Sequence, residues 1–275
     1  MFKGRKECVI LIWMIIKWLE CKEFGADRYQ VVKIKLREKK MINTILFDLD
    51  GTLLPMDQEL FVKTYFKLLL ERLVPLGYEK EKLIQTMMAG VEAMVRNDGS
   101  TNNETVFWKL FEKMMGTEAL KHRPLIDDFY TNDFNKASFT CPRNEKVKGY
   151  FEQVKAMGFR VVLATNPIFP APATENRIRW AGLNPEDFEL YTTYENSTFC
   201  KPNPKYYQEI LDKIGCKAEE CLMVGNDVTE DMVAETLGIK VFLHKDCLIN
   251  KEGKDISRYP QGGFEELMDF LKEIK

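Results

Sequence analysis

Two aspartates, Asp48 and Asp50, directly follow a short apolar run at residues 42–47 and directly precede Gly51. A spacing of two places both carboxylates on one face of an extended backbone, unless a turn begins between them. Two carboxylates this close repel each other, which raises one pKa or recruits a cation. Either outcome suits phosphoryl transfer, although a strand that simply ends in a polar Asp-Gly turn explains this short pattern equally well.

Two further sites could bind the phosphate of a substrate. Thr165 and Asn166 follow an apolar run at residues 159–164, where a hydroxyl, an amide and free backbone N–H groups can bind phosphate oxygens. Lys201 lies directly before Pro202, and at an effective dielectric of about 20 a cation 4 Å from a phosphate charge contributes roughly 4 kcal/mol before desolvation. Taken singly, a loop cap and a solvated lysine are the simpler explanations.

A third acidic residue follows the apolar run at residues 221–224. Asp227 comes after Gly225 and Asn226 and supplies the hard oxygen ligand that Mg²⁺ prefers. Asp231 lies one helical turn further along the chain. Because Lys201 comes after a further apolar run at residues 188–192, four apolar runs are followed by residues whose chemistry matches.

The elements that must position these residues indicate an α/β fold. Segments with helical periodicity separate the runs, so we expect βαβ units and a Rossmann-like parallel sheet, whose strand ends meet at one edge. The strands are predicted at residues 42–47, 159–164, 188–192, 221–224 and 239–243.

Residues 55–141 contain no convincing strand and show amphipathic helical patterns instead. Helices are predicted there at residues 60–73, 79–95, 104–115 and 124–130, and further along the chain at 205–214 and 264–274. The sequence thus predicts a Rossmann-like core formed by residues 41–55 and 141–275, with an inserted all-helical cap at residues 56–140. An insert at this point lies over the carboxyl ends of the strands, where open α/β sheets bind ligands.

Composition excludes several classes of function. The 40 Lys and Arg residues nearly balance the 42 Asp and Glu residues, so no global field would attract nucleic acid or an anionic membrane. The seven cysteines form no CxxC pair of the kind used by zinc and redox sites, which indicates reduced thiols and a cytoplasmic protein.

Residues 1–40 differ in kind from the rest of the chain. A basic start precedes an apolar run at residues 8–19, whose helix would rise only about 18 Å against a hydrocarbon core of about 30 Å. We interpret residues 1–40 as an N-terminal extension produced by a mis-assigned start, because Arg37-Glu38 can be encoded by a purine-rich ribosome-binding sequence just before Met41. An intact Met1 in the mass of the native protein would disprove this hypothesis.

The ordered motifs resemble those of the haloacid dehalogenase-like (HAD) hydrolase superfamily, from residue 41 to about 243. They are Asp48-Leu49-Asp50-Gly51-Thr52, Thr165-Asn166, Lys201, and Gly225-Asn226-Asp227 with Asp231. The insert resembles the α-helical cap of the subgroup that includes phosphoglycolate phosphatases, phosphonatases and β-phosphoglucomutases.

The resemblance implies a reaction through a covalent intermediate. Asp48 would attack phosphorus, and Asp50 would protonate the leaving oxygen and then activate water. Mg²⁺ would be bound by Asp48, the backbone carbonyl of Asp50, and Asp227.

The same resemblance implies roles for the remaining motif residues. Thr165 and the Asn166 backbone would bind the phosphoryl oxygens, Lys201 would offset charge on nucleophile and phosphate, and Asp231 would orient Lys201 or a metal-bound water. The pair Asn166-Pro167 departs from the small polar residues common at this motif, which leaves the approach of the substrate open.

The predicted function is Mg²⁺-dependent hydrolysis of a small phosphorylated metabolite. The intact pair Asp48 and Asp50 argues against the dehalogenase and phosphonatase branches, which lack the second aspartate. A phosphosugar mutase and a non-catalytic binding protein remain as alternatives. We assign no role to the possible substrate contacts in the cap, and the sequence does not define the substrate or the oligomeric state. Those possible contacts are Arg96, Trp108, His122 and Arg123.

Overall fold

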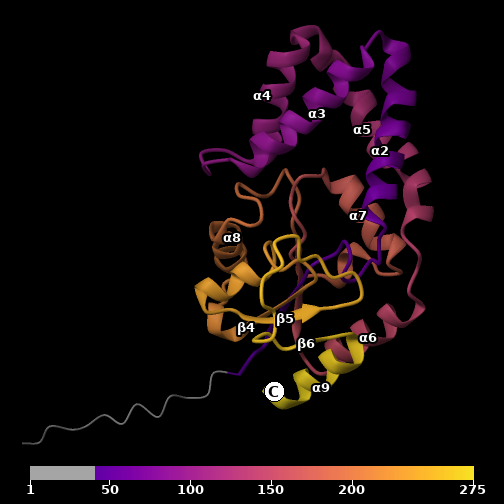
Figure 1. The fold of residues 1–275 in the computed structure, drawn as a ribbon. Helices are drawn as coiled ribbons and strands as arrows, with labels where there is room; N and C mark the ends of the chain where they lie inside the picture. The colour runs from indigo at the N-terminus through magenta and orange to yellow at the C-terminus, as the bar shows by residue number, and fades with distance from the viewer. Residues whose placement is uncertain (1–40) are drawn as a thin grey trace, which may run out of the picture. The chain divides into compact units, whose positions relative to one another are not determined.

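The computed structural model describes residues 41–275 (Figure 1), so the predicted N-terminal extension, residues 1–40, lies outside the described residues. The described residues, 41–275, cluster as one compact unit. Its sheet has six strands, and every pair of neighbours is parallel. The strands are β1 (Thr44–Phe47), β2 (Arg160–Leu163), β3 (Leu190–Tyr191), β4 (Cys221–Gly225), β5 (Lys240–His244) and β6 (Gln261–Gly262).

The strand order β3-β2-β1-β4-β5-β6 confirms the predicted Rossmann-like α/β fold. Strands β2 and β3 follow β1 in the sequence and lie on one side of it. Strands β4, β5 and β6 come next in the sequence and lie on the other side of β1, with β4 beside it. The direction of building therefore reverses between β1 and β4, and open α/β sheets bind ligands outside the carboxyl ends of the strands at such a point.

The central strand β1 is apolar because both of its faces are covered. All four of its residues are buried, and Phe47 lies opposite Leu163 of β2 and Val224 of β4. Such burial explains the continuous apolar run that predicted the strand. The predicted third strand is shorter than expected, and β6 was not predicted because Gln261 and Gly262 lack an apolar pattern.

The predicted helices agree with the structure within two residues at each end. Side chains cap several of them in the usual way: Asp57 accepts the backbone N–H of Leu60 at the start of α2, and Asn102 accepts that of Thr105 in α4. The helices are α2 (Gln58–Leu73), α3 (Lys80–Val95), α4 (Asn103–Met115), α5 (Arg123–Thr131), α6 (Glu145–Ala156), α7 (Ala171–Trp180), α8 (Pro204–Ile214) and α9 (Phe264–Ile274).

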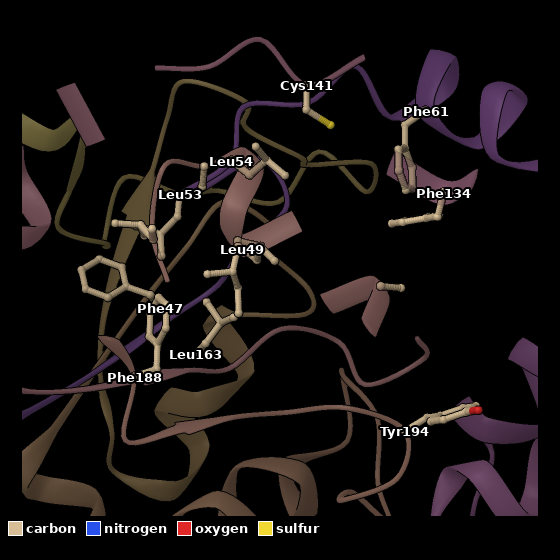
Figure 2. Packing of buried hydrophobic residues seen from close by; sticks show 14 of the residues in the cluster. Phe47, Leu49, Leu53, Leu54, Phe61, Phe134, Cys141, Leu163, Phe188 and Tyr194 are labelled. Atoms are coloured by element: carbon tan, nitrogen blue, oxygen red, sulfur yellow. The ribbon is translucent and has the colours of Figure 1, made fainter. Parts of the chain in front are cut away.

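No strand occurs between β1 and β2, and the predicted helical insert contains helices α2 to α5. Helix α6 follows the insert and leads into β2. The insert and the sheet share one apolar cluster, part of which Figure 2 shows. In it, the ring of Phe61 from α2 packs edge-on against Phe134 at 6.0 Å, while Leu49 and Leu54 pack beside the end of β1. The boundaries of the core and the cap within this single compact unit stay a prediction.

The start of α4 is hydrogen-bonded to the segment that follows β3. The backbone N–H of Asn103 donates to the carbonyl of Ser197 over 2.9 Å, and that of Glu104 donates to Tyr194 over 2.9 Å. The insert is therefore fixed to the carboxyl edge of the sheet at this point. Within residues 41–275, no helix has the length and apolar character needed to cross a membrane.

Candidate active site

A tight turn separates the two aspartates that follow β1. The backbone N–H of Leu54 donates to the carbonyl of Leu49 over 2.8 Å, so the turn begins between Asp48 and Asp50 and their side chains do not share one face. Gly51 has φ +87°, and a Cβ at this position would lie 2.3 Å from the side-chain nitrogen Nδ2 of Asn226. Only glycine suits this position, because it tolerates the left-handed conformation and the close approach.

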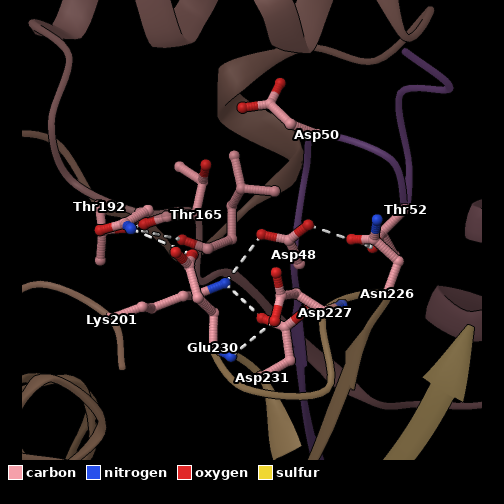
Figure 3. A network of polar contacts seen from close by, with 12 residues as sticks. Asp48, Asp50, Thr52, Thr165, Thr192, Lys201, Asn226, Asp227, Glu230 and Asp231 are labelled. Carbon is pink, nitrogen blue, oxygen red and sulfur yellow. Dashed lines mark hydrogen bonds and ion pairs between the residues drawn. The ribbon is translucent and has the colours of Figure 1, made fainter. Parts of the chain in front are cut away.

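The side chain of Lys201 connects two of the predicted site carboxylates (Figure 3). Its Nζ donates to Oδ1 of Asp48 over 2.8 Å and to Oδ1 of Asp231 over 2.6 Å. The lysine side chain is only 1% exposed, as is that of Asp231. The second oxygen of Asp48 accepts a hydrogen bond from the hydroxyl of Thr52 over 3.1 Å. Asp48 is therefore fixed in orientation by one neighbouring residue of its own turn and by one residue from a distant segment.

Lys201 stays charged although its side chain is buried. Burial by itself lowers the pKa of Lys201, but the carboxylates of Asp231 and Asp48 outweigh it and place that pKa well above its usual value. Burial also raises the pKa of Asp231 to about 7, although the Lys201 ammonium opposes the shift. One cation therefore faces two carboxyl groups inside the cluster.

The end of β4 positions Asp231 and Asp227. A Cβ on Gly225 would lie 2.2 Å from Oδ2 of Asp231, so glycine at this position makes room for that carboxylate. The same oxygen accepts the backbone N–H of Asp227 over 2.9 Å. Oδ1 of Asp227 in turn accepts the backbone N–H groups of Thr229 and Glu230, over 2.7 and 2.9 Å.

Thr165 and Asn166 lie at the end of β2, next to this network. The carbonyl of Thr165 accepts hydrogen bonds from the hydroxyls of Thr192 (2.6 Å) and Tyr206 (2.8 Å), which fixes the backbone there. Nδ2 of Asn166 donates to Glu230 over 3.1 Å. Burial raises the pKa of Glu230. Thr192, Tyr206 and Glu230 were not predicted to support the site.

One cavity of about 190 Å³ is lined by nearly all of the predicted site residues. Asp48, Asp50, Thr165, Asn166, Asp227 and Asp231 line it together with Gln58, Ile168, Asn226, Glu230, Ile249 and Lys251. Lys201 does not line the cavity itself. It is buried and donates a hydrogen bond to Asp48, which does. The structure thus brings all the predicted site residues into one cluster at the carboxyl edge of the sheet.

The donor groups at this edge suit Mg²⁺. Asp48 and Asp227 offer carboxylate oxygens and Asp50 a backbone carbonyl, which are hard ligands. In the described part of the chain, no three Asp, Glu, His or Cys side chains converge as a complete ligand set. Mg²⁺ commonly binds through one or two carboxylates and keeps several waters, so this donor set fits that ion.

Arg177 is a site residue that the sequence did not reveal. It comes from α7, and its guanidinium forms an ion pair with Oδ2 of Asp50. Burial raises the pKa of Asp50, with the guanidinium of Arg177 opposing the shift. The two residues are 127 positions apart, and an arginine on an amphipathic helix ordinarily indicates a solvated face.

The four possible substrate contacts in the insert have local partners instead, and none lines the cavity. Arg96 pairs with Glu92, and Arg123 pairs with Glu104. The other two donate to or accept from tyrosine hydroxyls: Trp108 Nε1 lies 3.4 Å from Tyr194, and His122 Nδ1 lies 2.9 Å from Tyr78.

The fold and the acidic cluster define a hydrolase built on a Rossmann-like sheet. A family model for haloacid dehalogenase-like hydrolases matches residues 42–234, more than half of the chain, and the chain therefore belongs to this family. The predicted superfamily is confirmed.

Known relatives agree with this assignment. The chain is 27% identical over 239 residues to a glyceraldehyde 3-phosphate phosphatase of Methanocaldococcus jannaschii, covering 86% of this chain and 99% of the relative. It is 25% identical over 199 residues to the pyrophosphatase PpaX of Bacillus cereus, covering 72% and 81%. The fold resembles that of a HAD phosphatase from Thermococcus onnurineus, with a TM-score of 0.52, 18% identity, and coverage of 83% and 97%. It also resembles a 2-haloacid dehalogenase from Pseudomonas syringae, with a TM-score of 0.56, 20% identity, and coverage of 85% and 99%.

Proposed function

We propose that this protein hydrolyses a small-molecule phosphate monoester in a Mg²⁺-dependent reaction, with Asp48 as the covalent nucleophile. The observation that carries the proposal is the network at Lys201, which fixes Asp48 beside the ends of β1 and β4. Phosphoryl transfer requires mainly positioning and positive charge near the phosphate. This network fixes the position of Asp48 and places the Lys201 ammonium beside it. The relative that is a glyceraldehyde 3-phosphate phosphatase supports a phosphate monoester as substrate, and the pyrophosphatase supports phosphoryl hydrolysis more broadly.

The residues at the cavity have distinct proposed roles. Asp48 attacks phosphorus in line, and Asp50 protonates the leaving oxygen and later activates water. Thr165 and the backbone of Asn166 bind the phosphoryl oxygens. Lys201 offsets the charge of nucleophile and phosphate.

Two further carboxylates support this chemistry. Asp231 keeps Lys201 in place through its 2.6 Å hydrogen bond. Asp227, Asp48 and the carbonyl of Asp50 would bind Mg²⁺, which supplies positive charge to the phosphoryl group. The relatives suggest glyceraldehyde 3-phosphate and pyrophosphate as the first compounds in a substrate panel. A cytoplasmic location stays a prediction, supported by the free thiols of the five described cysteines.

The direct test measures phosphate release from p-nitrophenyl phosphate and from a panel of phosphorylated metabolites. Wild-type protein should release phosphate with Mg²⁺ and lose that activity with a chelator or with Asp48→Asn. This substitution keeps the shape of the side chain and removes the nucleophilic charge. The matched control is Asp98→Asn, an exposed aspartate that does not line the cavity.

Two results would contradict the proposal. Phosphate release that persists in Asp48→Asn would exclude Asp48 as the nucleophile. Folded wild-type protein that binds Mg²⁺ but releases no phosphate from the panel would instead favour a phosphosugar mutase or a non-catalytic protein, because a mutase must protect its aspartyl-phosphate from water.

A further inference from the structure

The side chain of Arg177 is almost completely buried and is directed at the turn after β1. It is 1% exposed, and its Nη1 forms an ion pair with Oδ2 of Asp50. Nη2 donates to the hydroxyl of Thr174 and Nε to the carbonyl of Ala173, each over 3.3 Å, and the guanidinium carbon lies 4.6 Å from the centroid of the Phe169 ring. The guanidinium is therefore fixed on several sides.

The two carboxyl oxygens of Asp50 have different surroundings. Oδ2 accepts from Arg177, whereas Oδ1 is buried and has no hydrogen-bond partner among residues 41–275. Buried polar atoms in folded proteins are usually paired, because an unpaired one loses its hydrogen bonds to water. Asp50 lines the same cavity as Asp48, so the unpaired oxygen belongs to a residue of the proposed reaction centre.

We propose that Arg177 is a positioning residue for Asp50, which fixes Oδ2 so that Oδ1 is the oxygen that donates and accepts the proton. The inference rests on the proposed phosphatase function. It extends that function by explaining why a buried cation on α7 faces the second aspartate and not the first.

The two proton transfers balance in this arrangement. In the first step, an oxygen of Asp48 forms a bond to phosphorus, the ester P–O bond breaks, and the proton on Oδ1 of Asp50 moves to the leaving oxygen. In the second step, water attacks phosphorus, the bond between phosphorus and Asp48 breaks, and one proton of the water returns to Oδ1. No other reactant is required.

Helix α7 is itself anchored beside this contact. Nδ2 of Asn176 donates to the carbonyl of Tyr130 in α5 over 2.9 Å. The helix that carries Arg177 is thus hydrogen-bonded to the helical insert one residue away, which limits its movement. Preorganisation of this kind lowers the cost of aligning a catalytic group during the reaction.

The test compares full-length wild type, Arg177→Met and Arg177→Lys on two phosphate esters. An alkyl phosphate needs a proton on its leaving oxygen, whereas p-nitrophenyl phosphate has a good leaving group and needs little help. Because kcat/KM reports steps up to the first irreversible one, it isolates the first proton transfer. We expect Arg177→Met to lower kcat/KM roughly 10²-fold or more for the alkyl ester, and less than about 5-fold for p-nitrophenyl phosphate.

The second proton transfer has its own readout. With p-nitrophenyl phosphate, Arg177→Met should release a burst of p-nitrophenol and then turn over slowly, because water activation depends on the same oxygen of Asp50. The burst amplitude counts active sites, so a partly unfolded sample cannot imitate the slow phase. Arg177→Lys keeps the charge but not the fork of donors, and should show the same pattern in weaker form.

Arg179→Met is the matched control. Arg179 lies on the same helix, is half-exposed and pairs with Glu175. Its substitution should leave kcat/KM for both esters and the rate of steady turnover unchanged. Equal loss of kcat/KM on both esters in Arg177→Met and Arg177→Lys, or no loss on either, would overturn the inference while leaving Asp48-dependent hydrolysis intact. Absence of Asp48-dependent hydrolysis in the wild type would instead refute the proposed function.

Discussion

The carboxyl edge of the sheet and the helical insert bury opposite kinds of side chain. At the sheet edge, Lys201 and two aspartates form a buried charged network. The insert instead contributes aromatic rings to a small enclosed cavity of about 40 Å³, lined in part by Tyr65, Trp108 and other apolar side chains. We propose from this comparison that the strand ends supply the chemistry and that the insert selects the leaving group.

One residue lines the cavities of both regions. Ile168 contributes to the polar cavity at the sheet edge and to the aromatic cavity of the insert. It therefore lies between a volume with polar walls and a volume with mostly apolar walls. Substitutions at the sheet edge and at Ile168 can test whether catalysis depends on the first region and the choice of leaving group on the second.

The largest expected effect follows from removing the cation at the sheet edge. Lys201→Met should lower turnover of p-nitrophenyl phosphate by about 10³-fold, because the charge that faces Asp48 and the phosphate is lost. It should also destabilise the fold by about 3–5 kcal/mol, since Asp231 is left buried without its partner. Steady-state kinetics and denaturant unfolding measure the two effects.

The control for this prediction is Lys205→Met, an exposed lysine four residues further along the chain. It should retain both activity and stability. If Lys201→Met kept normal turnover, the charged network would be structural only, and the proposed division between the two regions would fail.

A smaller effect is expected at the boundary between the regions. Ile168→Ala should join the two cavities and raise kcat/KM for bulky aryl phosphates relative to small alkyl phosphates by roughly 10-fold, in line with the discrimination available to an apolar pocket. The ratio of kcat/KM values across a series of esters measures this change. An unchanged ratio would show that the leaving group does not enter the aromatic cavity.

The smallest effect concerns His244 at the end of β5, a buried polar residue outside the cavity. Both of its ring nitrogens lack hydrogen-bond partners among the described residues, and burial lowers its pKa although Asp246 and Glu266 oppose the shift. The unfolded chain therefore binds a proton near pH 6.5 while the folded protein does not, so stability should fall as the pH drops below that value.

His244→Phe should flatten this part of the stability curve between pH 7.5 and 5.5 and leave kcat unchanged. One additional proton bound by the unfolded chain lowers stability by about 1.4 kcal/mol per pH unit below pH 6.5, so the flattening down to pH 5.5 should be about that size or less. Urea unfolding at several pH values checks it. An identical pH dependence in wild type and variant would assign the acid sensitivity to other groups.

The sequence predicted the sheet edge well because parallel strands bring their carboxyl ends together. Asp48, Thr165 and Asp227 each follow an apolar run, so identifying the strands was enough to place these residues near one another. Lys201 lies nine residues beyond the run at residues 188–192, so a strand end alone does not place it, and it was predicted as a phosphate-binding cation only together with the other motifs. The structure then places its ammonium between Asp48 and Asp231.

The remaining features depend on contacts that a local pattern does not encode. Arg177 reaches Asp50 across 127 positions, and its helix looks like any amphipathic surface helix. Trp108 and His122 were possible substrate contacts by residue type, yet both bond to tyrosine hydroxyls within the packed structure. Side-chain partners at long sequence separation decide such cases, and they become visible only in three dimensions.

The proposed covalent mechanism is tested most directly by identifying the residue that carries the phosphoryl group. Asp50→Asn should slow the second step, so an acid quench during reaction with p-nitrophenyl phosphate, followed by peptide mass spectrometry, should detect one phosphoryl group on Asp48. No phosphoryl group on that peptide, or a phosphoryl group on a different residue, in a sample that shows a burst of p-nitrophenol would contradict the central claim that Asp48 is the nucleophile.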